Sequence, residues 1–234
     1  MPSTFKTKFI LAAAFLATVI CLAPVSRAAI ISGLFNTGVD PSAALLLTGQ
    51  PDPHYSLILP ASSTAVAVDD SAGSIITPLG SPWAQNSATS RWIGPSVSSS
   101  GAGGNYDYRT TFSLPANAVL STVNISGSWA VDDIIADVLI NGNSTAPITP
   151  FYTPLTPFTL PTGFYQTGIN TLDFLVGNAN IGQNPTGLRI EGIKGVYRVV
   201  PEPGTASMAI AGLFICSALA HRQRSQPLAE APMI

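Results

Sequence analysis

Short runs of alternating apolar and polar residues recur along the middle of the chain, and Gly, Pro or Asn interrupts each run. The clearest runs are 106–114 and 119–129. In the second, Val123, Ile125 and Trp129 are in phase while polar residues alternate with them, so Trp129 is predicted to lie in the core. No window outside the two ends of the chain sustains a helical period. The pattern therefore predicts an all-β protein.

The remaining strands are expected over shorter segments, with the residues between 80 and 104 left irregular. Asn141-Gly142 is predicted to form a hairpin turn. After Gly192 the apolar phase of the last strand slips, which predicts a β-bulge, with Leu188 and Ile190 inward and Arg189 outward. This number of short strands favours a two-sheet sandwich of jelly-roll type. The expected segments are 55–59, 64–68, 74–77, 134–140, 158–160, 171–177 and 188–199.

The N-terminal end has the pattern of a secretory signal peptide over residues 1–28. Lys6 and Lys8 precede an apolar run over 9–23, and small residues then stand at the positions that signal peptidase reads. Cleavage is expected between Ala28 and Ala29. A signal helix is therefore expected to precede the exported domain.

The C-terminal end combines a proline-rich segment, a short apolar run and a basic cluster. Pro201 and Pro203 lack backbone donors and disfavour a helix, so the chain around them is expected to be extended and exposed. The apolar helix over about 205–220 is shorter than the roughly 20 residues of a typical membrane span. Arg222 and Arg224 follow it, as the positive-inside rule requires. The polar tail 225–234 ends the sequence.

This order of Pro201-Glu202-Pro203, apolar segment and arginines over residues 200–224 resembles the PEP-CTERM sorting signal of bacterial exosortase substrates. The resemblance implies that the tail holds a precursor in the inner membrane until exosortase cuts near the triplet. The mature protein would then reach the cell surface or the extracellular matrix. An uncleaved single-span anchor is the alternative. Family members usually end just after the arginines, whereas this chain continues to Ile234.

The exported domain, residues 29–199, contains neither of the two cysteines, since Cys21 and Cys216 both lie in the hydrophobic ends. It must be held together by packing and not by disulfides. Its five Lys and Arg residues stand against ten Asp and Glu residues, a formal net charge of −5. This sparse, acidic surface argues against nucleic acid as a partner.

Several short motifs occur in order along the exported domain and together resemble the galactose-binding-like β-sandwich of bacterial exported proteins. The resemblance implies a carbohydrate-binding ancestry, although one fold hosts many functions. The motifs are Asp52-Pro-His-Tyr55, Ser90-Arg-Trp-Ile93, Tyr108-Arg-Thr-Thr-Phe112, Trp129 to Asp133, Asn141-Gly142, Asn170-Thr-Leu-Asp-Phe174 and Asn184-Pro-Thr-Gly-Leu188.

The candidate ligand-binding residues are Trp83 and Trp92 in the long irregular segment, with Arg91, Asn178 and Asn180. Sugars stack on exposed aromatic rings, and arginine and asparagine bond hydroxyl groups. The alternative is that the tryptophans plug the core beneath this segment, because large aromatic residues are mostly buried. The asparagines have turn formation as their alternative role.

Few residues in this sequence support a catalytic or metal-binding site. Asp132 and Asp133 are weak candidates for a structural calcium site, with turn formation as the alternative. Adjacent strand residues point to opposite faces, so the two carboxylates are not expected to flank one bond. His54 is the domain's only histidine. We therefore expect a non-enzymatic protein without a required cofactor.

Taken together, the sequence predicts an exported, exosortase-sorted, non-catalytic surface or matrix protein that binds an exopolysaccharide or another glycan. Signal peptidase and exosortase would be its processing enzymes, and the inner membrane a transient partner. A structural adhesin or biofilm component that binds protein or itself is the alternative. A glycan hydrolase using Asp132, Asp133 or His54 is a third reading.

Overall fold

The computed structural model describes residues 27–59, 64–67, 83–146, 151–179, 182–200, 212, 213 and 215–217. The chain divides into two units: Ala28–Val199, and a second unit comprising Met1–Arg27 and Val200–Ile234. In the second unit residues 212, 213 and 215–217 are helical. None of the described helical residues belongs to a helix long and apolar enough to span a membrane. Several expectations lie outside the described residues: the signal peptide before Arg27, the strand 74–77, Asn180, most of the apolar helix 205–220, the polar tail 225–234, and the sorting residues Pro201, Glu202, Pro203, Arg222 and Arg224.

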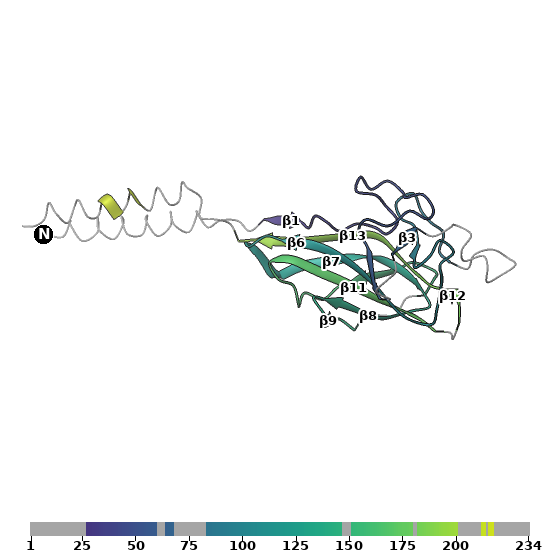
Figure 1. Ribbon diagram of the computed structural model, residues 1–234. Coiled ribbons are helices and arrows are strands. Elements are labelled where there is room, and N and C mark those ends of the chain that lie inside the picture. The colour runs from purple at the N-terminus through teal and green to yellow at the C-terminus, as the bar shows by residue number, and fades with distance from the viewer. Residues whose placement is uncertain are drawn as a thin grey trace, which may run out of the picture. The chain divides into compact units, whose positions relative to one another are not determined.

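The unit Ala28–Val199 is all-β, as predicted, and its strands form two main antiparallel sheets (Figure 1). The first sheet has the order β10 (Thr156–Thr159), β7 (Ala118–Asp132), β13 (Gly187–Val199), β4 (Ile93–Gly94) and β3 (Val66–Ala67), and β1 (Ala28–Ile30) also pairs with β13. The second has the order β2 (Ser56–Leu59), β6 (Gly104–Leu114), β11 (Gly168–Asn178), β8 (Ile134–Ile140) and β9 (Asn143–Ser144). A third pair joins β5 (Ser100–Gly101) to β12 (Asn184–Pro185).

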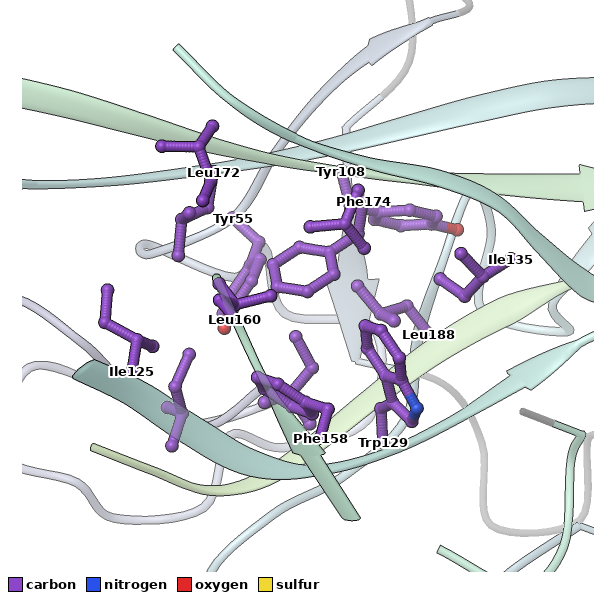
Figure 2. Close-up of a cluster of buried hydrophobic side chains, with 14 of the residues drawn as sticks. Tyr55, Tyr108, Ile125, Trp129, Ile135, Phe158, Leu160, Leu172, Phe174 and Leu188 are labelled. Carbon is purple, nitrogen blue, oxygen red and sulfur yellow. The ribbon is translucent and has the colours of Figure 1, made fainter. Parts of the chain in front are cut away.

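The core lies between the inner faces of the two main sheets. Tyr108 and Phe174 come from the second sheet and Trp129 from the first, and all three are fully buried in one cluster (Figure 2). The predicted alternation over 106–114 is confirmed, because the apolar face of β6 is buried throughout. The core position predicted for Trp129 is confirmed as well.

Two local predictions about glycine are also confirmed. Asn141 and Gly142 both have positive φ, 51° and 80°, and they join β8 to β9 as the hairpin turn that an Asn-Gly pair favours. Gly192 has a φ of 65°, and the register of β13 on β7 shifts between Glu191 and Lys194. The bulge explains why the buried face of β13 changes from Ile190 to Ile193.

Arg189 points away from the main core, as predicted, but it does not reach solvent. Its side chain is on the outer face of the first sheet, yet only 1% of the residue is exposed. Segment 83–92 lies over that face and is bonded to it: Arg189 Nε donates to Ser90 Oγ at 2.9 Å, and its Nη1 donates to the carbonyl oxygens of Ala84 and Gln85. Both faces of this sheet are therefore covered near Arg189.

Candidate functional site

The predicted aromatic platform is not on the surface. Trp83 and Trp92 are 5% and 3% exposed, and with Ala130 they form a small second core on the outer face of the first sheet. Their ring centroids are 4.3 Å apart. The expectation that they offer a free face for a sugar is therefore wrong, and the alternative that they are buried beneath the long segment is confirmed. Burial of apolar surface stabilises this position, because the two rings pack on each other and on the β7 surface at Ala130.

Arg91 and Asn178 are held in separate structural contacts. Arg91 is buried; it donates from Nη1 to the carbonyl oxygen of Leu46 at 2.7 Å and from Nη2 to Thr48 Oγ1 at 3.0 Å. Asn178 is also buried, and its Nδ2 donates to the carbonyls of Gly101 and Ala102 at 3.1 and 3.0 Å. Among the predicted ligand-binding residues that the structure describes, Trp83 and Trp92 are in ring contact with each other.

Asp132 and Asp133 each accept a hydrogen bond from a neighbouring segment of the chain. Trp83 Nε1 donates to Asp132 Oδ2 at 2.7 Å, and the backbone N–H of Ala179 donates to Asp133 Oδ2 at 2.7 Å. The pKa of Asp132 is raised to about 7, mainly by burial. The hydrogen bond from Trp83 acts to lower this pKa, and a hydrogen bond with Asp133 and repulsion from it act to raise it. The two carboxyls therefore interact, contrary to the expectation that they point apart.

No metal site is assembled around these carboxyls in the part of the chain that the structure describes. No group of three or more His, Cys, Asp or Glu side chains capable of holding a metal ion is present among the described residues. His54 is held elsewhere, stacked on Phe35 with ring centroids 3.6 Å apart. Asp132 and His54 therefore take part in separate contacts, with Trp83 and Phe35 respectively.

A cleft of about 320 Å³ opens at the edge of the sandwich where β10 runs beside the end of the β9 hairpin. Most of its lining is apolar, with two threonine hydroxyl groups. The lining residues are Trp129, Thr145, Ala146, Pro157, Phe158, Thr159, Leu160 and Pro161. An apolar concavity with a few polar groups is the usual form of a small-ligand site, so this cleft is the candidate functional site.

Trp129 lies at the floor of the cleft, where its ring packs on other aromatic side chains. Its ring stacks on Phe158 with centroids 4.5 Å apart, and it meets Phe174 edge to face at 6.1 Å. Figure 2 shows the five-membered ring of Trp129, with its nitrogen, turned away from Phe174. The Nε1–H group is buried and has no hydrogen-bond partner among the described residues. A buried donor without a partner costs about 1–3 kcal/mol, which the packing of the ring on Phe158 and Phe174 must offset.

Gly127 is needed for the packing that forms this cleft wall. It stands opposite Phe158 in the pairing of β7 with β10. A Cβ atom at this glycine would lie 3.0 Å from Phe158 Cζ and 3.1 Å from Ile193 Cα. The absence of a side chain at Gly127 lets Phe158 lie flat against Trp129.

The free edge of β10 is poorly suited to adding another strand. Leu160 N–H donates to the carbonyl of Ile125 at 2.9 Å, so alternation along an antiparallel pair turns the backbone of Pro157 and Thr159 outward. Pro157 has no N–H to offer, which leaves Thr159 as the outward donor of this short strand. The cleft beside this edge is therefore better suited to a small group than to an extended peptide.

Sequence reasoning identified the edge strand and the buried Trp129 but did not join them into a site. The cleft depends on β10 and the residues after β9 meeting across the end of two different sheets, which no local pattern reveals. The available signal was Trp129 itself, because a core tryptophan needs a partner for its N–H.

No protein-family model matches the sequence, and no curated protein matches it. Among solved structures, the chain is similar to the crystal structure of the CBM36-1 domain of a multidomain xylanase from the hindgut metagenome of Trinervitermes trinervoides. The two share 16% identity, the match covers 44% of this chain and 75% of that chain, and the TM-score is 0.26. We base no argument on a likeness at this TM-score.

Proposed function

We propose that this chain is an exported, non-catalytic glycan-binding protein whose binding site is the Trp129 cleft. The observation that carries the proposal is a concave, mostly apolar site with an aromatic floor that also holds the hydroxyl groups of two threonines. Pyranose rings present apolar C–H faces together with hydrogen-bonding oxygens. The proline and aromatic surfaces of the cleft suit the apolar faces, and the hydroxyl groups of Thr145 and Thr159 suit the oxygens.

The size of the cleft favours one or two sugar units of a chain over a whole polysaccharide surface. About 320 Å³ lies at the lower end of the range for small-molecule sites. The exposed residues Pro157, Thr159 and Pro161 surround a buried floor of Trp129 and Phe158. A terminal or branching sugar of an exopolysaccharide is the ligand that this shape supports best.

Binding is tested with the full chain, purified in a detergent without a sugar headgroup, by affinity gel electrophoresis through a panel of polysaccharides. We expect at least one polysaccharide to retard the protein. Thr159→Tyr fills the cleft mouth from an exposed position and should abolish retardation. Thr111→Tyr is the matched control, because Thr111 is an exposed strand threonine of the second sheet. Retardation that Thr159→Tyr leaves unchanged would place the site elsewhere and refute the proposal.

Export and sorting form the second part of the proposal, and the two ends of the sequence support it. The first strand begins at Ala28, beside the expected signal-peptidase site, and pairs with β13 so that Ala28 lies opposite Arg198. Both ends of the unit Ala28–Val199 therefore lie at the same end of β13. A single membrane could then hold the precursor by either end.

Sorting is tested in an exosortase-bearing bacterium by following a tag placed after Ile234. We expect the tag to be lost from the mature surface protein and a Pro201→Ala, Glu202→Ala, Pro203→Ala variant to keep it. A tag that persists on the wild-type chain would favour the uncleaved anchor.

A further inference from the structure

We propose that one end of the sandwich rests against the membrane surface while the precursor is held in the membrane. This inference rests on the membrane-held precursor of the proposed function and does not depend on the glycan site. We call this end the exit end, because both ends of the unit Ala28–Val199 lie there. It is formed by Ala28, Val199, the connection 115–117, the turn Asn141–Gly142 and Gly168.

The strand pairings bring these elements to one end of the sandwich. Ala28 begins β1, which pairs with the last residues of β13, and Val199 lies opposite Ala118, the first residue of β7. Three residues separate Ala118 from Leu114, the last residue of β6, and Gly168 lies opposite Leu114. Both hydrophobic segments that the sequence predicts therefore join the unit at the exit end.

Large apolar side chains are exposed at the exit end. Ile169, the second residue of β11, is 69% exposed, and Phe164 in the preceding loop is 49% exposed. Ile30 of β1 is 81% exposed and lies opposite the exposed Val196. A single exposed apolar residue is ordinary on a protein surface, but several from different elements at one end indicate an interaction surface.

Buried asparagine side chains hold the loop that carries two of these residues. Asn170 is fully buried; its Oδ1 accepts from the Gln166 N–H at 2.9 Å, and its Nδ2 donates to the Gln166 carbonyl oxygen at 2.7 Å. Asn141 Nδ2 donates to the Phe164 carbonyl oxygen at 2.8 Å. Phe164 and Ile169 are thus displayed by a loop whose backbone is already fixed, so docking orders little additional chain.

The charge of the exit end differs from that of the rest of the exported domain. The four stretches that supply this end contain no acidic residue, although the domain has ten and a formal net charge of −5. Arg198 and Lys194 on β13 are both exposed. A bilayer with anionic headgroups therefore attracts the domain most when the exit end faces it. The stretches are 28–39, 108–131, 138–172 and 192–199.

A membrane surface is the partner that fits this combination. Interfacial protein surfaces place apolar and aromatic side chains at the boundary of headgroups and acyl chains, and basic side chains among the headgroups. The exposed apolar residues of the exit end suit the first role, and Arg198 suits the second. This orientation also keeps the cleft away from the bilayer, because Trp129 lies eleven residues along β7 from Ala118, roughly 35 Å at the rise of a strand.

The test inserts the full, unprocessed chain into vesicles of equal amounts of acyl-brominated phosphatidylcholine and phosphatidylglycerol. Bromine quenches tryptophan only at close contact. Ile169→Trp and Phe164→Trp each place a probe at the exit end. Ile134→Trp is the matched control, because Ile134 is an exposed isoleucine at the start of β8, the end of that strand remote from the turn Asn141–Gly142. The unsubstituted chain supplies the signal of the native tryptophans for subtraction.

We expect brominated lipid to remove about half or more of the emission added by Ile169→Trp and by Phe164→Trp, relative to the same lipids without bromine. The emission added by Ile134→Trp should not change. Arg198→Glu, combined with Ile169→Trp, should reduce the quenching on vesicles that contain phosphatidylglycerol and leave it unchanged on phosphatidylcholine alone.

The outcomes separate this inference from the function on which it rests. A chain that does not float with the vesicles would overturn the membrane-held precursor and this inference together. A chain that floats while neither exit-end probe is quenched, or while the Ile134→Trp control is quenched equally, would overturn the inference alone. An exit-end probe whose emission shifts to the blue without bromine quenching would show that protein covers this end, such as a second copy of the chain, and would also overturn it.

Discussion

The indole Nε1–H of Trp83 donates a hydrogen bond of 2.7 Å to Oδ2 of Asp132, and both residues are buried on the outer face of the first sheet. The bond joins segment 83–92 to the end of β7. The pKa of the Asp132 carboxyl group is raised to about 7, mainly by burial, although the hydrogen bond from Trp83 acts to lower it. This contact helps fix the long segment that sequence reasoning left irregular.

Trp83→Phe should destabilise the fold by about 1–3 kcal/mol at pH 8, because it keeps most of the ring burial but removes the donor to a buried carboxylate. The loss should be smaller at pH 5, where a carboxyl with a pKa of about 7 is already neutral. Urea unfolding at the two pH values measures the difference. An equal loss at both would show that ring packing alone accounts for the effect.

Asp107 should make the protein less stable as pH rises. Its pKa is raised to about 6, mainly by burial and also by repulsion from Asp173, while attraction to Arg109 acts to lower it. Since the folded-state pKa is above the unfolded value of about 3.9, the folded state binds more protons between these values. Stability therefore falls from about pH 4 to about pH 6 and levels off above that.

Asp107→Asn should remove this dependence, so the variant's stability relative to the wild type should increase from pH 4 to pH 6.5. Thermal unfolding across that range is the measurement. The salt bridge of Arg109 with Asp173, at 2.5 and 2.9 Å, should persist in the variant. A constant difference between the two proteins at every pH would contradict the assignment.

Arg189 should be among the costliest charged residues to replace. Its guanidinium bonds Ser90, the carbonyls of Ala84 and Gln85, and Glu191 Oε2 at 2.5 Å, all while buried. Arg189→Met should cost about 3 kcal/mol or more, since these acceptors lose their donor. It should also expose segment 83–92 to limited proteolysis.

The control for Arg189 is Arg198→Met on the same strand, where the side chain is exposed. That change should stay within about 0.5 kcal/mol. Chemical denaturation of both variants, with protease digestion patterns beside it, decides the comparison. Similar small losses in the two would mean that Arg189 does not hold the segment in place.

Gly127→Ala should destabilise the fold by about 1–3 kcal/mol and disturb the cleft. The added Cβ would press on Phe158 Cζ at 3.0 Å and on the Ile193 backbone at 3.1 Å. Gly163→Ala is a matched control, because a Cβ there meets nothing within 4 Å. Thermal unfolding compares the two variants, and equal melting temperatures would contradict the tight packing of Phe158 on β7.

The sequence predicted the sheets better than it predicted the site. The buried face of 106–114 and the core position of Trp129 could be predicted, because side chains alternate between the two faces of a strand and the apolar residues mark the buried face. Arg189 was placed outward because β13 alternates, and only the distant segment 83–92 covers it. The same segment takes Trp83 and Trp92 away from solvent. Such long-range covering has no local signature, since it requires two stretches about one hundred residues apart to meet.

The most direct test of the cleft as the binding site is an NMR titration of the three indole N–H signals in the ¹⁵N-labelled full chain. Trp83 and Trp92 donate to Asp132 and Ala84, whereas the Trp129 N–H has no acceptor among the described residues. Each signal is assigned with its Trp→Phe variant. On adding a glycan that retards the chain in affinity gels, we predict a saturable shift of the Trp129 signal alone, because its ring lies at the floor of the cleft. Saturable binding with shifts at Trp83 or Trp92 and none at Trp129 would contradict it.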